Sequence, residues 1–266
     1  MTGSAARQTE HRAPFASQRR QAIVRTLRSS GRVDAAEMAA ELRVTNETVR
    51  KDLIQLERQG LLRRVHGGAV PIEQLSYEPD VAARTEFADA KQRIAMAAFA
   101  HLPADGGSVL LDAGSTTSRL ADIFPSDRSL IVFTNTLPIA LTLLARPNLT
   151  VHTIGGRLRG TTSAEVGPWA DRTLRELNVD VAFLGTNGIS LDRGLTTPDP
   201  AEAATKRLML SSARQRILLA DHSKLGMVSL CKHGELSDVD LLITDSALPD
   251  HQRVALAAAG LAIECA

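Results

Sequence analysis

Residues 35–70 constrain the fold more than any other part of the chain, because two short helical patterns, a brief break and a basic hairpin pattern follow one another there. In both helical patterns apolar residues recur at the spacing of one helix face, at Met38, Ala39 and Leu42 and then at Val49, Leu53 and Leu56. Residues 43–45 leave room only for a sharp turn between the helices. This order of elements is typical of a winged helix-turn-helix, which binds DNA.

Thr45 indicates where the second helix begins, because a threonine before Asn46 and the acidic Glu47 is a typical N-cap. With the apolar stripe facing inward, the helical period turns the polar residues of the first turns outward. We expect Asn46 and Arg50 to contact base edges in the major groove and Lys51 to contact phosphates, as do the basic residues of the wing. The predicted DNA-binding residues are Thr45, Asn46, Glu47, Thr48, Arg50, Lys51, Arg63, Arg64 and His66.

The wing is predicted from Gly67 and Gly68, which suit a tight turn between two strands. An ordinary helical pair with a solvated charged face is the alternative. The charge distribution favours the DNA-binding interpretation: the whole chain has a net charge of +1, but residues 1–68 hold 13 basic and 7 acidic side chains, against 18 and 23 in the remainder.

Composition excludes several other classes of protein. Cys231 and Cys265 are the only cysteines and have no metal-ligand spacing, so we expect free thiols, no metal and no cofactor. The weakly polar run at 254–263 is too short to span a bilayer, and residues 1–18 lack the apolar core of a signal peptide. We therefore expect a cytoplasmic protein without a membrane partner.

Four parts follow from these patterns. Residues 1–16 are expected to be a disordered tail, and 17–71 the winged helix-turn-helix, whose first helix turns Ile23, Val24 and Leu27 inward. Residues 72–89 mix Pro and acidic residues with few periodic apolar positions, which predicts a linker. Residues 90–266 are expected to form the second domain.

The second domain alternates β-rich and helical segments, which predicts a layered α/β fold with a mostly parallel sheet. Buried parallel strands are expected from about residues 108, 129, 149, 180, 215 and 240. Helices are expected from near residue 90 and at 116–124, 137–146, 167–178, 200–213 and 250–260, with a last short strand at 261–264.

Polar loops follow most of these strands, and in such sheets ligands bind where strands end. The segment 112–117, DAGSTT, ends a strand and opens a helix, so its backbone N–H groups and hydroxyls suit a phosphate. The predicted effector-binding residues are Asp112, Gly114, Ser115, Thr116, Thr117, Thr134, Asn135, Thr136, Gly155, Gly156, Thr186, Asn187, Gly188, Glu202, Lys206, Asp221, Ser223 and Lys224.

Each of these features has a purely structural alternative. Gly, Ser, Thr and Asn are common in any strand-to-helix turn, although several such loops on one sheet edge favour a ligand site. Glu202 and Lys206 also have the spacing of a solvated i,i+4 pair. His222 and His233 are expected on the surface, and the single tryptophan, Trp169, is expected to pack.

At the N-terminal segment the residues resemble a known family. The spacing of Arg19, Ile23 and Leu27, followed by Thr45, Thr48, Val49, Arg50, Lys51, Asp52 and Leu53 and by the HGGA of the wing, is similar to the signature of the DeoR family of bacterial transcriptional regulators. Lys51 stands where the family commonly has arginine, which keeps the charge but loses the planar fork. This departure affects only a bidentate contact at that position.

The second domain carries further motifs in the family's order: DAGSTT at 112, TNT at 134, GG at 155, FLGTNGIS at 183, GLTT at 194 and ADHSKLG at 220. Glu78, Arg84 and Lys91 also fall where the family has like residues. The resemblance implies an effector domain with a fold like that of ribose-5-phosphate isomerase, a phosphorylated sugar or related effector, and a homo-oligomer. Residues 226–239 match least well and receive no role.

Two function classes compete: a repressor of a carbohydrate-metabolism operon that binds operator DNA and senses a metabolite, and a sugar-phosphate isomerase or deaminase with an accessory DNA-binding module. In a third class the C-terminal domain only oligomerises. The basic N-terminal segment favours the repressor, because an isomerase needs no winged helix-turn-helix. We expect no catalytic residues, and we expect the effector to act by binding unequally to states that fit or do not fit paired DNA half-sites.

Overall fold

The computed structural model describes residues 15–30, 32–71, 75–76, 78, 80–81 and 84–266. Contacts divide the chain into two compact units, Met1–Glu73 and Gln74–Ala266. Most of the expected tail at 1–16 and part of the expected linker at 72–89 lie outside the described residues.

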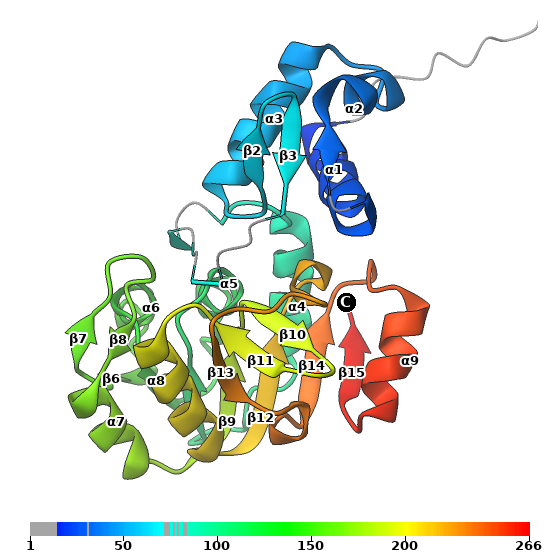
Figure 1. Cartoon of the computed structure of the whole chain (residues 1–266). Helices are drawn as coiled ribbons and strands as arrows, with labels where there is room; N and C mark the ends of the chain where they lie inside the picture. The colour runs from blue at the N-terminus through cyan, green and yellow to red at the C-terminus, as the bar shows by residue number, and fades with distance from the viewer. Residues whose placement is uncertain (1–14, 31, 72–74, 77, 79, 82–83) are drawn as a thin grey trace, which may run out of the picture. The chain divides into compact units, whose positions relative to one another are not determined.

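The N-terminal unit has the expected helices and wing (Figure 1). Its helices are α1 (Ala16–Ser30), α2 (Ala35–Glu41) and α3 (Asn46–Arg58). The wing strands β2 (Arg63–Val65) and β3 (Gly68–Val70) pair antiparallel. A short strand that the sequence analysis missed, β1 (Val33–Asp34), adds to β3 and gives the order β1-β3-β2.

Both apolar stripes of the helix-turn-helix are buried in one core together with the inward face of α1, as predicted. The turn between α2 and α3 places Arg43 at φ 54°, and the wing turn places Gly67 at φ +82°, which glycine adopts without strain. Gly68 is required for a different reason: a Cβ atom there would lie 1.9 Å from the carbonyl oxygen of Val33. The unpredicted strand β1 therefore explains the second glycine of the wing.

The C-terminal unit contains a seven-stranded sheet in the order β15-β14-β12-β9-β4-β5-β6, and every neighbouring pair is parallel. Its strands are β4 (Ser108–Leu111), β5 (Leu130–Thr134), β6 (Leu149–Thr153), β9 (Val179–Leu184), β12 (Ala213–Leu219), β14 (Leu241–Thr244) and β15 (Ala262–Cys265). The predicted parallel α/β architecture is confirmed.

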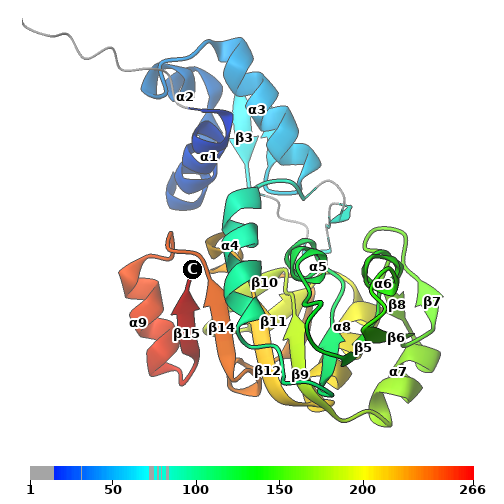
Figure 2. The ribbon, with the colours of Figure 1, turned by 180° about the vertical axis from the view of Figure 1, so that it is seen from behind.

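Helices cover both faces of this sheet. They are α4 (Ala88–Phe99), α5 (Ser115–Asp122), α6 (Leu137–Leu144), α7 (Pro168–Arg175), α8 (Pro200–Ser211) and α9 (Asp250–Ala258). Apolar residues of α4, α5 and α6 share one core cluster with Val109 and Leu111, and those of α7, α8 and α9 share another with Leu110. Alternate residues of β4 thus face opposite layers, as the period of a strand requires. Figure 2 shows the layer of α4, α5 and α6.

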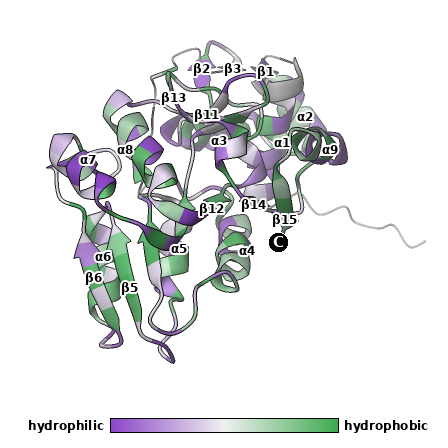
Figure 3. Ribbon diagram, turned by 90° about the horizontal axis from the view of Figure 1, so that it is seen from below, coloured by the Kyte–Doolittle hydropathy of each residue, from purple (hydrophilic) through white to green (hydrophobic). Residues whose placement is uncertain are grey.

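The prediction of buried strands is correct for the central strands and wrong for the edge strand β6. Hydrophobic residues run along β5 (Figure 3), whereas β6 and β15 expose much of their length because each has a neighbour on one side only. Two smaller sheets were not predicted. One is the hairpin of β7 (Arg157–Leu158) and β8 (Glu165–Val166). The other consists of β10 (Gly188–Ser190), β11 (Gly194–Thr197) and β13 (Cys231–Gly234).

Three single-residue expectations are wrong or incomplete. Trp169 does not pack: 78% of it is exposed at the start of α7. His233 is not on the surface, because β13 carries it inward, where it is 1% exposed. His222 is half-buried and its Nδ1 lies 2.8 Å from Asp245 Oδ2. Residues 226–239, which had no assigned role, contribute β13 to the smaller sheet.

Candidate functional site

The outer face of α3 carries the predicted DNA-contacting side chains on consecutive turns. Asn46, Glu47, Arg50 and Lys51 are all exposed, while Val49 between them is buried. Among the described residues, no acidic side chain lies within ion-pair distance of Arg50 or Lys51. The face is therefore free to meet an acidic surface such as DNA.

The start of α3 is capped as predicted. Thr45 Oγ1 accepts a hydrogen bond from the Thr48 backbone N–H at 3.2 Å, and the two threonine hydroxyls lie 2.9 Å apart. Thr45 therefore has a structural task, in addition to any contact with DNA.

Ion pairs hold this face on its support. Arg19 of α1 donates to the buried Asp52 of α3, with Nε 2.7 Å from Oδ2. Glu57 accepts from both the backbone N–H and the Nε of Arg64, at 2.9 and 2.6 Å, so the wing is tied to the end of α3. Arg63 and His66 are exposed on the wing. Of the three basic wing residues, Arg64 alone has an acidic partner among the described residues.

A pocket in the C-terminal unit lies at the carboxyl ends of the adjacent strands β12, β9 and β4. Ten predicted effector-binding residues line it: Gly114, Ser115, Thr116, Thr117, Thr186, Asn187, Glu202, Lys206, Asp221 and Lys224. Glu78, Arg84, Lys91, Thr162, Ala113, Gly185, Leu219 and Ala220 line it as well. The loops converge because parallel strands end at one edge of the sheet.

One wall of the pocket is the N-terminus of α5. Gly114 precedes the helix and, because it has no side chain, it forms no capping hydrogen bond with the first turn. Within the described residues the hydroxyls of Ser115 and Thr116 also form no hydrogen bond, whereas Thr117 Oγ1 donates to the Gly114 carbonyl at 3.0 Å. Unpaired N–H groups and hydroxyls at a helix N-terminus suit an anion.

Another wall is cationic. Lys91 of α4 is 4% exposed, and its Nζ donates to the backbone carbonyl of Arg84 at 2.9 Å. Burial lowers the pKa of Lys91 to about 8; Asp221 raises it, and the cations Lys224 and Arg84 lower it further. A buried lysine beside two other cations favours a negatively charged ligand.

A buried ion pair lies beneath the pocket. Lys206 of α8 donates to Asp112 Oδ2 and, at 3.0 Å, to the Gly185 carbonyl. Asp112 also accepts from the Gly185 N–H at 3.0 Å and from Asn135 Nδ2 at 3.2 Å. Because Glu202 and Lys206 are each 4% exposed, the alternative of a solvated pair is wrong. Asp112 belongs to this ion pair but does not line the pocket.

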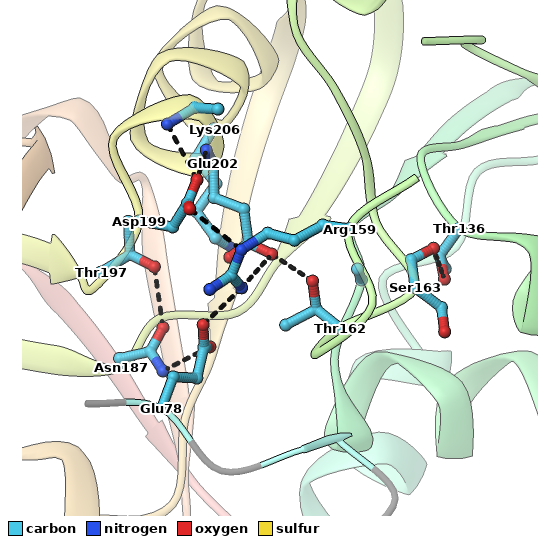
Figure 4. Close-up of polar contacts among 12 residues, drawn as sticks. Glu78, Thr136, Arg159, Thr162, Ser163, Asn187, Thr197, Asp199, Glu202 and Lys206 are labelled. Carbon is cyan, nitrogen blue, oxygen red and sulfur yellow. Dashed lines mark hydrogen bonds and ion pairs between the residues drawn. The ribbon is translucent and has the colours of Figure 1, made fainter. Parts of the chain in front are cut away.

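Three carboxylates surround Arg159, which comes from the β7–β8 hairpin (Figure 4). Its Nη1 lies 2.5 Å from Glu78 and 3.1 Å from Glu202, and its Nε lies 3.0 Å from Asp199. Glu202 also accepts from the Thr162 hydroxyl. Burial raises the pKa of Glu202 and the nearby Glu78 carboxylate adds to this, although Lys206 and Arg159 lower it.

The remaining predicted residues support the pocket from outside. Asn135 accepts the Ala113 N–H on its side-chain oxygen at 2.7 Å and the Glu165 N–H on its carbonyl at 2.6 Å, and Thr136 donates to the Ser163 carbonyl at 3.0 Å. The TNT segment thus fixes the β7–β8 hairpin. The predicted residues that do not line the pocket are Asp112, Thr134, Asn135, Thr136, Gly155, Gly156, Gly188 and Ser223.

Sequence reasoning missed Arg159 and Thr162, because the unpredicted hairpin that carries them has no periodic apolar pattern. It noted Glu78, Arg84 and Lys91 as family-like but did not place them in the site. A further missed residue, His233, contacts Thr186 Oγ1 through Nε2 at 3.0 Å, and its Nδ1 has no partner in the described part of the chain. Burial, Lys206 and Arg207 all lower the pKa of His233, so it is neutral.

Neither a metal site nor a membrane span is found in the described ranges. No group of three or more His, Cys, Asp or Glu side chains there is arranged to hold a metal ion. No helix there combines the length and apolar character needed to cross a bilayer.

Comparison with known families identifies both units. Residues 19–75 match the DeoR-like helix-turn-helix domain, and residues 86–246 match the DeoR C terminal sensor domain. The second match alone covers more than half of the chain.

Curated relatives match over nearly their whole length. The chain is 36% identical to the HTH-type transcriptional regulator GlpR of Haloferax volcanii, over 92% of this chain and 96% of that protein. It is 32% identical to a putative aga operon transcriptional repressor of Escherichia coli O157:H7, over 96% and 95%. It is 29% identical to the glycerol-3-phosphate regulon repressor of Escherichia coli K12, over 87% and 92%.

Solved structures are more distant. The full-length sorbitol operon regulator SorC of Klebsiella pneumoniae is 13% identical over 91% of this chain and 99% of that chain, with a TM-score of 0.41. Ribose 5 phosphate isomerase A of Neisseria gonorrhoeae is 17% identical with a TM-score of 0.37, over 52% of this chain. This chain spans about half the length of the isomerase, 53%.

Proposed function

We propose that this chain, which belongs to the DeoR family of transcriptional regulators, represses a carbohydrate-metabolism operon under the control of a phosphorylated sugar that binds in the pocket of its sensor domain. Family membership makes the chain a DNA-binding transcriptional regulator and not an enzyme. Relatives named as repressors of the aga operon and of the glycerol-3-phosphate regulon support the carbohydrate assignment. Because a transcriptional regulator acts on DNA, we propose that this protein works in the cytoplasm.

The observation that carries the ligand class is the uncapped N-terminus of α5 beside cationic side chains. We place the phosphate against the backbone N–H groups of Ser115, Thr116 and Thr117, where the helix terminus supplies partial positive charge. Lys91 and Lys224 line the same pocket and supply full charges.

Acceptors in the pocket suit the hydroxyl groups of a sugar. Asp221, Asn187 and Glu202 line the pocket and offer carboxylate or amide oxygens. Sugar hydroxyls can donate to these oxygens while the phosphate meets the cations. A neutral sugar would use only the acceptors and gain no ionic contact with the cations, so it should bind more weakly.

Thermal and chemical stability report binding directly. A matching sugar phosphate at about 100 times its dissociation constant should stabilise the protein by about 2.7 kcal/mol. The unphosphorylated sugar at the same concentration should have little effect. A panel of sugar phosphates measured by thermal shift tests this, and a panel in which none stabilises the protein more than its free sugar would contradict the proposal.

A matched pair of lysine variants locates the site. Lys224→Met removes a cation that lines the pocket, whereas Lys232→Met removes one that is exposed on β13 and paired with Glu235. We expect the first variant to lose the stabilisation by the sugar phosphate and the second to keep it. Equal responses of the two variants would place the ligand elsewhere.

We also propose that the protein is a homo-oligomer, because paired DNA half-sites require a symmetric regulator. Helix α6 is uncharged and exposes an apolar stripe in which Leu141 is 69% and Leu144 is 63% exposed. Burial of this stripe against a second copy would remove it from water. Light scattering of the wild type and of a Leu141→Lys, Leu144→Lys variant tests this: the variant should have the smaller mass.

A further inference from the structure

Glu78 is a carboxylate of the chain itself that lies inside the sensor pocket. Its side chain is 2% exposed and meets three donors: Arg84 Nη2 at 2.5 Å, Arg159 Nη1 at 2.5 Å and Asn187 Nδ2 at 3.0 Å. Figure 4 shows the contacts with Arg159 and Asn187. This is the coordination that a buried anionic ligand would receive.

The Glu78 carboxylate keeps its negative charge although it is buried. Burial raises the pKa of Glu78, but Arg84 and Arg159 more than offset this effect, so the pKa is lowered and the carboxylate is ionised. Arg159 also forms ion pairs with Asp199 and Glu202. Glu78 therefore competes with two other carboxylates for a single guanidinium.

The three donors are held independently of Glu78. Lys91 Nζ fixes the Arg84 carbonyl at 2.9 Å, and the Asp199 carboxylate holds Arg159 Nε at 3.0 Å. Asn187 Oδ1 accepts from the Thr197 hydroxyl at 3.0 Å, which orients its Nδ2 toward Glu78. The side chains of Arg159 and Asn187 thus have partners that do not depend on Glu78, and the backbone of Arg84 has one as well.

Among the described residues, backbone hydrogen bonds attach the chain on either side of Glu78. On its N-terminal side the Leu75 carbonyl accepts from the Leu230 N–H at 2.9 Å, and on its C-terminal side the Val81 N–H donates to the Thr161 carbonyl at 2.9 Å. In contrast, Glu202 belongs to α8, and Asp199 caps that helix by accepting from the N–H groups of Ala201 and Glu202. Of the three carboxylates around Arg159, Glu78 is the one that no helix fixes.

We propose that Arg84, Arg159 and Asn187 form a second anion subsite in the sensor pocket, which Glu78 fills until a phosphate or carboxylate group of a ligand takes its place. This inference rests on the proposed function, since it assigns a second contact to the same effector pocket. The C-terminal unit begins at Gln74 and the N-terminal unit ends at Glu73, so Glu78 lies close in sequence to the only covalent connection between them. Its displacement would report the ligand to the segment that joins sensor and DNA-binding domain.

Inorganic phosphate is the probe for both subsites, and titration calorimetry of the full chain counts the bound ions. Wild-type protein should bind one phosphate tightly, at the N-terminus of α5, and a second one only weakly, because the second must displace Glu78. Glu78→Gln keeps the shape of the side chain but removes its charge, so this variant should bind a second phosphate at least about tenfold more tightly than the wild type does. Glu235→Gln, which changes an exposed carboxylate of the same unit, should behave as the wild type.

The outcomes separate the two hypotheses. One phosphate in both the wild type and Glu78→Gln would overturn the second subsite and leave the proposed function standing. No phosphate in the wild type but one in the variant would contradict the α5 site and support the second subsite. No phosphate in either would overturn both.

Hydrogen exchange supplies a second measurement that does not depend on a variant. With the wild type at a phosphate concentration high enough to fill the weaker second subsite, displacement of Glu78 should speed exchange of the Val81 and Leu230 amides, while amides at the start of α5 should exchange more slowly. Protection at α5 with unchanged exchange at Val81 and Leu230 would show that the ligand leaves Glu78 in place, and would refute the inference.

Discussion

The outer face of α3 and the sensor pocket are both polar surfaces for a ligand, but they are built in opposite ways. The α3 face takes its side chains from one short segment, and Thr45, Asn46, Glu47, Arg50 and Lys51 are all exposed. The pocket takes its side chains from positions as distant as Glu78 and Lys224, and most are buried and bonded to one another. The first surface is presented by one helix, whereas the second exists only after seven strands have assembled.

The difference shows how burial changes the task of a polar residue. An exposed residue such as Arg50 keeps its solvation by water until DNA arrives, so it needs no partner in the free protein. A buried residue such as Asp112 must be paired at all times, because an unpaired charge in a low-dielectric interior is strongly unfavourable. The pocket therefore combines ligand binding with stability, and the α3 face does not.

The largest expected effect is the loss of the buried ion pair beneath the pocket. Lys206→Met leaves the fully buried Asp112 carboxylate without its cation and should lower the free energy of unfolding by about 3–5 kcal/mol. Urea unfolding followed by circular dichroism measures this. Lys232→Met breaks an exposed pair and should change the same free energy by less than about 1 kcal/mol. Equal losses in the two variants would remove the distinction between buried and exposed polar residues.

The next effect belongs to the α3 face and should leave stability unchanged. Arg50→Ala should weaken binding to DNA selected by the wild type from a random library by about 1–3 kcal/mol and relax the preference at one base pair. Lys51→Ala should weaken binding to all sequences alike, because a phosphate contact reads no base. Fluorescence anisotropy with single-base variants of the selected site separates the two patterns, and unaltered specificity in Arg50→Ala would refute its assignment to a base.

The pocket should also respond to pH. The pKa of Lys91 is about 8, so its charge is lost as the pH rises through that value, whereas a sugar phosphate stays dianionic above pH 7. Affinity for the ligand should therefore fall by up to about tenfold from pH 7 to pH 9. Calorimetric titration measures the profile, and Lys91→Met should bind weakly with little dependence on pH.

Stability without ligand should change in the opposite direction over a related range. The folded-state pKa of Lys91 lies below its ordinary value of 10.5, so the unfolded chain binds more protons between about pH 8 and 10.5. The contribution of Lys91 to the free energy of unfolding therefore increases with pH in this window. The absence of that increase relative to Lys91→Met would contradict the assigned pKa.

The smallest expected effect separates capping from DNA contact at the start of α3. Thr45→Ala removes the acceptor for the Thr48 N–H and should lower stability by about 1 kcal/mol. Thr45→Ser retains the hydroxyl and should restore most of that loss. If Thr45→Ala weakens DNA binding without any change in unfolding, its role is a direct contact and not a cap.

Prediction from sequence succeeded where a local period controls the structure. The helix-turn-helix, its cap at Thr45 and the central parallel strands follow from spacings of two or three to four residues, which the chain shows directly. It failed where the position in the sheet matters. The edge strand β6 was predicted as a buried strand like the central ones, and only the strand order shows that it lacks a neighbour on one side.

The candidate site divides in the same way. Loops that follow strands could be expected to meet, and ten of the predicted residues do line the pocket. The sequence could not show that Asn135 and Thr136 support a hairpin, nor that this hairpin brings Arg159 to Glu78 and Glu202, which line the pocket. These contacts join residues 27 to 81 positions apart, and no local pattern records them.

By itself, the sequence determined that the chain has a DNA-binding helix with an outward polar face and an α/β domain with polar strand ends, because side chains on one helix or strand follow a fixed period. Tertiary structure alone decided which polar residues are buried together. It placed the carboxylates of Glu78 and Glu202 beside the guanidinium of Arg159. The physical reason is desolvation: the energy of each of these groups depends on partners that are distant in the sequence and are brought into contact only by the packed fold.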